Sequence, residues 1–326
     1  MRVIGLTVVL VVNLIFAPLA GEAQQTGKVW RIGWLSPPSA ETGASELDAL
    51  RKGLKELNYI EGRNVAIEAR WADGDAARLP RLARALVELK VDVLCTAGTP
   101  ATLAAKQVTE TIPIVFGRAA FPDRTGLVSS LARPGGNLTG VAFVGPEYGK
   151  RLELLREVAP KLSRVALLYN DKNAASVLAM DETKEWAKAL RVVVEAVGVH
   201  DRPSLDTAFI AMRRRPPDAL MTTADPLVSS YRTFIVDFAA EHRLISMFGD
   251  RDYVKAGGLM FYGTSTTDMW RHAAVYVDRI LKGAKPGDLP VEQPTKFELI
   301  INLKMAKAIG VTIPPAVLIR ADQVIE

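Results

Sequence analysis

The sequence contains very few of the side chains that build cross-links and metal centres. Among its 326 residues there is one cysteine, Cys95, and there are three histidines. A single cysteine excludes a disulfide within the chain and a zinc site built on several cysteines. A multi-histidine centre would need nearly all of His200, His242 and His272. We therefore expect no metal and no cofactor.

Sequence motifs of catalysis are also missing. The chain has no Gly-x-Ser-x-Gly nucleophile turn, no Gly-x-x-x-x-Gly-Lys-Ser/Thr phosphate loop and no Gly-x-Gly-x-x-Gly run. Asp250 and Asp252 are closely spaced carboxylates, but nothing else in the sequence marks them as an acid and a base. We predict no catalytic residue, with a secreted α/β enzyme as one alternative.

The charge of the chain gives little reason to expect a nucleic-acid partner. The 41 basic and 36 acidic residues leave a net charge of +5. The densest basic run, residues 213–215, is short and is followed by Pro216 and Pro217. A nucleic-acid groove usually needs a basic stripe with aromatic platforms. We interpret the run as a solvated helix end.

The first residues predict export from the cytoplasm. A basic start at Arg2 precedes an almost wholly apolar stretch over residues 3–19, and Gly21-Glu22-Ala23 has the small-x-small pattern of a cleavage site. This pattern is typical of a secretory signal peptide, residues 1–23. The alternative is an uncleaved anchor helix, for which an apolar length of about 17 residues is marginal. No cysteine follows the stretch, so we expect a soluble periplasmic protein without a lipid anchor.

The rest of the chain alternates between expected strands and helices. Four strands with helices between them are predicted up to residues 112–116, and the pattern then restarts with strands that include 164–169, 219–222 and 244–248. A helix is expected over 229–242. Repeated strand–helix units are the signature of doubly wound parallel sheets. We therefore predict an α/β protein with two such lobes.

The order of the units places the lobe boundaries. A return strand before residue 268 suggests that the chain re-enters the first lobe. We expect lobe 1 to contain residues 28–143 and 264–294, and lobe 2 to contain residues 144–263 and 295–326. A hinge of three crossings is then predicted near 141–145, 262–265 and 293–296.

The carboxyl ends of parallel strands are where such sheets bind ligands. Hydroxyls and backbone N–H groups at helix starts also suit anionic groups. The residues at or just beyond these strand ends, which we expect to line the cleft, are Ser36, Ser39, Gly98, Thr99, Arg118, Tyr169, Asn170, Thr223, Asp225 and Phe248.

These residues are assigned roles by their chemistry. Polar groups of lobe 1 would bind an acid group of the ligand, with Arg118 as a bidentate partner. Asp225 is the candidate for a donor group, and Tyr169 and Phe248 would supply aromatic area. The alternatives are that Ser39, Thr99 and Asp225 only cap helices, that Arg118 is a surface side chain and that the aromatic rings pack in the core.

Four longer segments carry a family resemblance. Residues 131–140 (LARPGGNLTG), 221–226 (MTTADP), 256–263 (AGGLMFYG) and 281–302 (with LPVEQPTKFEL) together resemble the tryptophan/tyrosine-type substrate-binding proteins of ABC transporters. The resemblance covers residues 28–326. It implies the type I periplasmic binding-protein fold and a non-catalytic receptor. Such a receptor closes two lobes on a small solute and delivers it to a membrane permease.

One position departs from the family pattern. Many relatives read Gly-Asp-Pro after the fourth strand, whereas this chain reads Ala120-Phe121-Pro122. Phe121 therefore joins the predicted ligand-binding residues, but it cannot pair with a ligand ammonium group as an aspartate would. An aromatic or aliphatic carboxylate thus becomes a candidate ligand beside an amino acid. We expect a monomer that serves an ABC importer, with a periplasmic sensory subunit as the other alternative.

Overall fold

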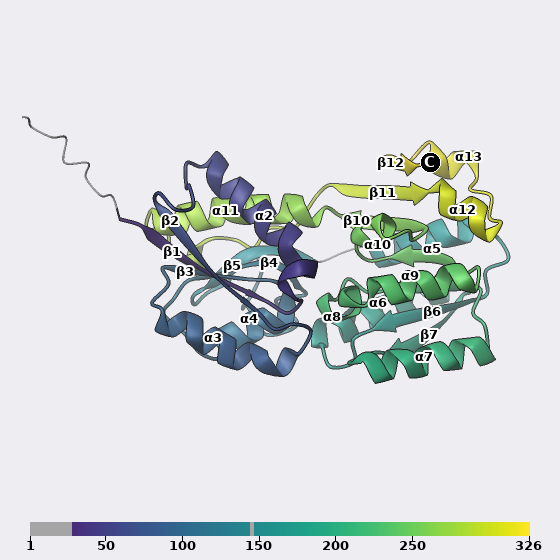
Figure 1. The fold of residues 1–326 in the computed structure, drawn as a ribbon, viewed down its shortest axis with the longest axis horizontal. Coiled ribbons are helices and arrows are strands. Elements are labelled where there is room, and N and C mark those ends of the chain that lie inside the picture. The colour runs from purple at the N-terminus through teal and green to yellow at the C-terminus, as the bar shows by residue number, and fades with distance from the viewer. Residues whose placement is uncertain (1–27, 144–146) are drawn as a thin grey trace, which may run out of the picture.

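The computed structural model describes residues 28–143 and 147–326 and contains two β-sheets. The lobe built on the five-stranded sheet is called lobe 1, and the lobe built on the seven-stranded sheet is called lobe 2. The lobes lie side by side along the long axis of the molecule (Figure 1). The predicted signal peptide, residues 1–23, lies outside the described residues. Within the described ranges, no helix has both the length and the apolar character needed to cross a membrane.

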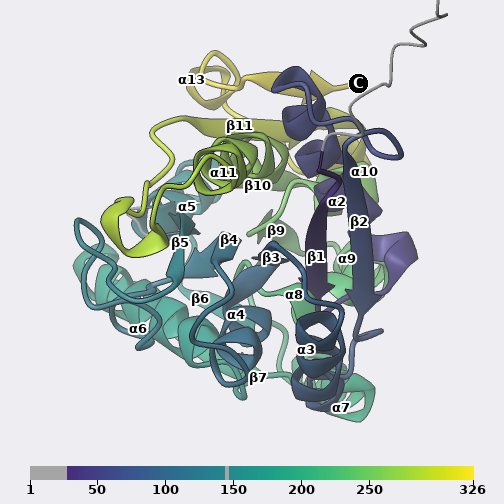
Figure 2. The same ribbon diagram turned by 90° about the vertical axis from the view of Figure 1, so that its left-hand side faces the viewer.

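Lobe 1 is a parallel sheet with strand order β2-β1-β3-β4-β5. Its strands are β1 (Trp30–Ser36), β2 (Val65–Trp71), β3 (Val93–Thr96), β4 (Ile114–Ala120) and β5 (Leu138–Phe143). Its helices are α2 (Ala40–Glu56), α3 (Leu79–Glu88), α4 (Gly98–Lys106) and α11 (Thr266–Leu281), with 3-10 turns at Ala76–Arg78 and Pro286–Asp288. Helices α2 and α11 cover one face, and α3 and α4 cover the other (Figure 2). Strands β3 and β5 are fully buried and mostly apolar because helices cover both faces of the sheet.

Lobe 2 has strand order β12-β11-β10-β9-β8-β6-β7. Its strands are β6 (Arg164–Tyr169), β7 (Val193–Gly198), β8 (Ala219–Thr222), β9 (Ile245–Phe248), β10 (Met260–Thr264), β11 (Phe297–Asn302) and β12 (Gln323–Ile325). Its helices are α5 (Glu147–Val158), α6 (Ala174–Leu190), α7 (Arg202–Arg214), α8 (Pro226–Ser230), α9 (Arg232–Glu241), α10 (Asp252–Lys255), α12 (Leu303–Ile309) and α13 (Pro315–Leu318). All pairings are parallel except β10 with β11.

The chain passes between the two sheets three times. Strand β5 belongs to lobe 1 and α5 packs in lobe 2, so the first crossing includes residues 144–146, which are outside the described residues. The second crossing follows β10, and the third lies between Glu292, which bridges to Val141, and β11. The predicted fold class is confirmed. One pairing differs from the predicted parallel sheets, because β11 is antiparallel to β10. The residue limits of the lobes stay a prediction.

The fourth strand is longer than predicted, and this changes the setting of Arg118. Strand β4 runs to Ala120, so Gly117 and Arg118 lie within the strand and not in a loop beyond it. The pairing with β5 shifts by one residue between Phe116 and Ala119, which is a β-bulge. Bulges bend a strand and redirect its side chains. Gly140 faces this bulge with φ +150°, and a Cβ there would lie 2.0 Å from the Phe116 carbonyl oxygen.

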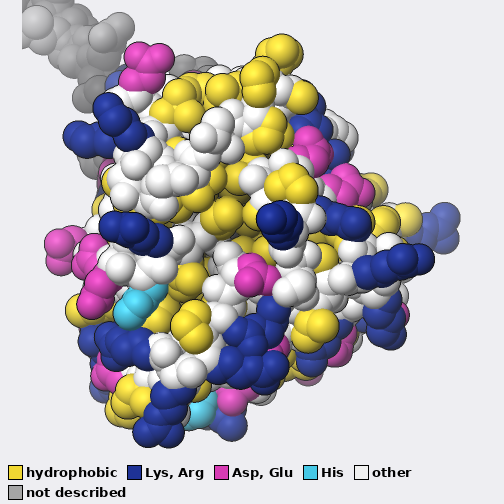
Figure 3. Space-filling model, turned by 90° about the vertical axis from the view of Figure 1, so that its right-hand side faces the viewer, with side chains coloured by type: hydrophobic (Ala, Val, Ile, Leu, Met, Phe, Trp, Pro, Cys, Tyr) yellow, Lys and Arg dark blue, Asp and Glu magenta, His cyan; other side chains and the backbone are white. Residues whose placement is uncertain are grey.

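One predicted helix is also wrong. The helix expected over 229–242 is two helices, α8 and α9, separated at Tyr231. Helix α8 starts one residue after its N-cap, Asp225, and ends after five residues. Figure 3 shows the end of lobe 2 that faces away from lobe 1, where basic, acidic and apolar side chains are interspersed. Arg213 and Arg214 end α7 and are exposed, as a solvated helix end requires.

Candidate functional site

Two small cavities near the centre of the cleft lie between the lobes, and they share Arg118 and Pro226. The first cavity holds about 30 Å³, which is space for little more than water. Lobe 1 lines it with Pro38, Thr42, Ser45, Glu46, Ala97 and Arg118, and lobe 2 with Pro226, Ser229, Ser230, Arg232, Asp250, Asp252 and Tyr253. The two lobes are therefore in contact around this cavity and leave no room in it for an organic solute.

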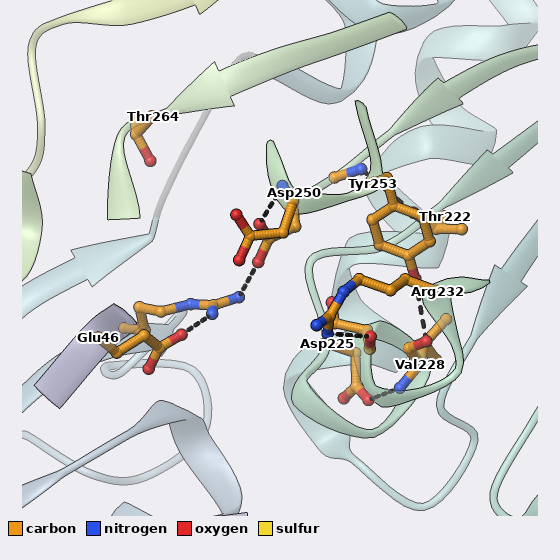
Figure 4. Close-up of polar contacts among 12 residues, drawn as sticks. Glu46, Thr222, Asp225, Val228, Arg232, Asp250, Tyr253 and Thr264 are labelled. Atoms are coloured by element: carbon orange, nitrogen blue, oxygen red, sulfur yellow. Dashed lines mark hydrogen bonds and ion pairs between the residues drawn. The ribbon is translucent and has the colours of Figure 1, made fainter. Parts of the chain in front are cut away.

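Arg118 connects the two lobes at the centre of the cleft. Its Nη1 pairs with Oε1 of Glu46, which is on α2 of the same lobe. Its Nη2 lies 3.3 Å from Oδ2 of Asp250, which follows β9 in lobe 2. The side chains of Arg118, Glu46 and Asp250 are 5%, 13% and 9% exposed. Figure 4 shows Glu46 and Asp250 with dashed lines marking both ion pairs.

Burial and charge both act on this cluster. Burial raises the pKa of Glu46; Arg118 lowers it, and Asp250 raises it again. Burial lowers the pKa of Arg118, but Glu46 and Asp250 outweigh that effect and raise it, so the guanidinium stays charged. Two buried carboxylates from different lobes thus share one cation. Trp270 Nε1 donates to the second oxygen of Glu46 at 3.2 Å and fixes its orientation.

The second cavity is smaller, at about 10 Å³, and is lined by Gly98 and Thr99 of lobe 1 and Tyr148 and Thr223 of lobe 2, among others. Most of its hydroxyls already have partners in the protein. Thr99 Oγ1 accepts from the Ala120 N–H at 3.0 Å, and the Thr223 and Ser176 hydroxyls lie 2.8 Å apart. This part of the cleft is therefore polar and satisfied in the closed form.

Gly98 lies close against lobe 2 beside this cavity. It has φ +79°, and a Cβ added there would lie 3.0 Å from Cγ of Pro226. A second interlobe contact stacks Phe121 on Tyr148, with ring centres 6.2 Å apart. Arg124 and Glu182 form an exposed ion pair at 2.6 Å. Closure is thus held by contacts outside the charged cluster as well.

Several predicted residues act as helix caps. Asp225 is the N-cap of α8 and accepts from the Leu227 and Val228 N–H groups, at 2.9 and 3.0 Å. Asn170 and Asn173 donate to the same carboxylate. Burial raises its pKa, and the hydrogen bond from Asn173 lowers it. Ser39 caps α2 by accepting from the Thr42 N–H. The capping interpretation describes both residues well, although Asp225 and Asn170 also line an outer part of the cleft, as does Ser39.

Other predicted residues lie in the core. Phe248 is fully buried and stacks on Tyr253 with ring centres 4.5 Å apart. Tyr169 packs against the core of lobe 2. Ser36 is fully buried, and its hydroxyl has no partner among the described residues. None of these three lines either of the two cavities, so the expected aromatic area from Tyr169 and Phe248 is not at the cleft centre.

The strongest polar groups of the site were missed by the sequence reasoning. Glu46 precedes the apolar residues of an amphipathic helix and looks like an ordinary surface acid. Asp250 comes two residues after β9, in a loop that the strand-end rule selects, but only Phe248 of that loop was expected to bind the ligand. Ser229 and Arg232 also line the first cavity. In the described part of the chain, no group of three or more His, Cys, Asp or Glu side chains is placed to hold a metal ion.

Comparison with known proteins shows that the chain matches a family of substrate-binding proteins. A family described as ABC transporter substrate binding protein matches residues 38–325. A tyrosine-binding protein of Clostridioides difficile (strain R20291) is 27% identical over 267 residues, which is 81% of this chain and 77% of that protein.

Two solved structures differ in how well they superpose. A domain from Streptococcus pneumonia in complex with L-Trp is 26% identical, covers 91% of this chain and 99% of its own, and has a TM-score of 0.86. A ligand-free, open substrate-binding protein from Clostridium difficile is 25% identical with the same coverage, but its TM-score is 0.66. At nearly equal identity, this chain thus superposes better on the structure with a bound ligand.

Proposed function

Because the chain belongs to the ABC transporter substrate-binding protein family, we propose that it captures a small organic solute between its lobes and delivers it to a membrane permease for import. It is a binding protein and not an enzyme. The proposed ligands are an amino acid, with tryptophan and tyrosine first because relatives bind them, and aromatic or aliphatic carboxylates. We propose that it acts as a monomer without a cofactor.

One observation carries the proposal. Charged side chains from both lobes meet at Arg118 in an enclosed cavity. Pockets with a few convergent polar groups are the usual sites for small ligands. The closed arrangement and the better superposition on the L-Trp complex than on the open structure support a receptor that closes on its ligand.

A thermal-shift screen tests this function. The twenty amino acids and a set of aromatic and aliphatic carboxylates are added singly to the purified protein. A ligand at 100 times its Kd stabilises the folded state by about 2.7 kcal/mol, so we expect at least one compound to raise Tm by roughly 5 °C. The same compound should lower the radius of gyration in solution scattering. The receptor function is contradicted if no compound in the screen shifts Tm.

We also propose that the protein is exported to the periplasm. The support is the signal-peptide pattern of residues 1–23, together with a family that serves membrane transporters. In a Gram-negative host, the mature protein is expected in the periplasmic fraction with Gln24 as its first residue. Ala23→Arg removes the small side chain before the cleavage point and should leave an uncleaved precursor. Recovery of the wild-type chain with Met1 intact contradicts cleavage.

A further inference from the structure

A small group of apolar side chains is buried where the two lobes meet. Phe121, which follows β4 in lobe 1, packs with Tyr148 of α5 and Ala179 of α6 in lobe 2. Each of the three is only 3% exposed. They form a cluster of their own, separate from the cores of both lobes. Burial of this apolar surface therefore depends on contact between the lobes, and its stabilising effect is lost when they separate.

Two guanidinium groups accompany the stacked rings of this cluster. The planes of Phe121 and Tyr148 are within 19° of parallel. Cζ of Arg124 lies 5.1 Å from the ring centre of Phe121, and Cζ of Arg151 lies 5.4 Å from that of Tyr148. Both distances are within the range of about 6 Å over which a cation is attracted to an aromatic face. These four side chains, two from each lobe, are called the aromatic latch.

The backbone of Phe121 has a conformation that is unusual for such a side chain. Its φ is +49°, in the left-handed region that bulky residues rarely adopt. The other five non-glycine residues with positive φ in the described ranges are polar and exposed. The Phe121 N–H donates to the Phe143 carbonyl oxygen at 3.1 Å, and the Thr125 N–H and hydroxyl both donate to the Phe121 carbonyl oxygen at 2.8 Å. Strained residues held in place by their surroundings are concentrated at functional sites.

The ring of Phe121 is not placed to contact a solute at the centre of the cleft. Phe121 lines neither of the two central cavities. At one end of the latch, Arg151 is fully buried, and its Nε donates at 2.7 Å to the carbonyl oxygen of Tyr262, in the strand that precedes the second crossing. At the other end, Arg124 pairs with Glu182 of lobe 2 at 2.6 Å. The latch thus joins the hinge to an ion pair between the lobes.

We propose that the aromatic latch holds the lobes together in the absence of a solute, with Phe121 as its central residue. The latch acts through contact between the lobes and not through contact with the ligand. The ligand-free protein therefore populates the closed arrangement, and a solute stabilises a state that already exists. Loss of one stacked aromatic pair shifts such an equilibrium by about twofold to twelvefold.

Distances between spin labels on the two lobes test the latch without any ligand. Arg84→Cys in α3 and Ala211→Cys in α7 provide exposed attachment points. Both helices lie on the side of the molecule opposite α11, away from the second crossing (Figure 1). The native Cys95 is fully buried and stays unlabelled. Pulsed electron paramagnetic resonance of the ligand-free protein should show a short-distance, closed component beside a longer, open one.

Phe121→Leu is the informative variant in this labelled protein. It keeps an apolar side chain but removes the stacked ring, and it should lower the ratio of closed to open protein at least threefold. Tyr148→Leu removes the same stack from lobe 2 and should have the same effect. Phe209→Leu is the matched control, because Phe209 stacks on Phe238 with ring centres 4.3 Å apart and Arg213 lies 5.4 Å from the Phe238 ring, all within lobe 2. This control should lower Tm and leave the ratio unchanged.

The outcomes separate the latch from the receptor function. Excess L-tryptophan is added in a second measurement. If it does not enlarge the closed component, tryptophan is not the ligand, and the latch is still judged on the ligand-free ratio. The latch is overturned if the ligand-free wild type shows only the open component, if Phe121→Leu and Tyr148→Leu both keep the wild-type ratio, or if Phe209→Leu lowers the ratio equally.

Discussion

Arg118→Ala is expected to lower the free energy of unfolding by about 3 kcal/mol at neutral pH. Removing one partner of a buried ion pair costs about 3–5 kcal/mol, because it leaves the other charge uncompensated. Here Glu46 and Asp250 both lose their shared cation. Affinity for a carboxylate-bearing ligand should also fall by about 1.5–3 kcal/mol. Urea unfolding and calorimetry measure the two effects.

The stability deficit of Arg118→Ala should depend on pH. Arg118 lowers the pKa of Glu46, so its removal lets burial raise that pKa further. A carboxyl whose pKa is higher in the folded than in the unfolded state destabilises the fold above the unfolded pKa, and protonation removes the penalty. The deficit is therefore expected to be smaller at pH 5 than at pH 8. Arg124→Ala, at an exposed pair, should cost less than about 1 kcal/mol. An Arg118→Ala deficit no larger than this control contradicts the prediction.

Gly140→Ala is expected to destabilise the protein by about 4 kcal/mol or more, the range of exceptional single substitutions. The added Cβ would lie 2.0 Å from the Phe116 carbonyl oxygen and 2.7 Å from the Phe116 nitrogen. Both atoms are backbone, so no side chain can move to make room. Strands β4 and β5 must separate where Phe116 pairs with Gly140, and the bulge that carries Arg118 is lost with them.

Gly136→Ala is the matched control for this substitution. Gly136 has φ +61° with nothing within 4 Å of an added Cβ, so only the left-handed backbone conformation is penalised, by about 1 kcal/mol. Urea unfolding of the two variants separates the steric cost from the conformational one. Equal stability of the two would show that β4 and β5 tolerate a side chain at their closest approach.

The sequence predicts strands well where burial is continuous. Strands β6 and β8 have the predicted limits, because each is an apolar run that polar residues end on both sides. The end of β4 could not be predicted, because Arg118 reads as the first polar residue of a loop. It is accommodated inside the strand because two distant carboxylates pair with it, Glu46, 72 residues earlier in the chain, and Asp250 of lobe 2. Pairing over such distances leaves no periodic signal.

In the site, too, the sequence predicts residues at strand ends but not residues whose positions depend on distant contacts. The strand-end rule found Gly98, Thr99, Arg118 and Thr223, which all line the cleft cavities. It could not find Glu46, whose position depends on how α2 packs on α11 and on the hydrogen bond from Trp270. It also could not tell a cleft residue from a core residue, since Phe248 ends a strand but turns toward Tyr253.

The position of α11 in the chain has a consequence for how the protein reaches its native state. Helix α11 packs on α2 so closely that a Cβ on Gly53 would lie 2.7 Å from the Arg271 carbonyl oxygen. A chain made from its N-terminus therefore produces the five strands of lobe 1 long before α11, which covers one of their faces together with α2. Leu47, Leu50 and Leu54 of α2 belong to the same core cluster as the α11 side chains, which are synthesised only after the strands of lobe 2 up to β10. Lobe 1 therefore begins to fold first but cannot be completed first, because a fragment ending at residue 143 lacks the buried side chains of α11, among them Trp270 and Tyr276.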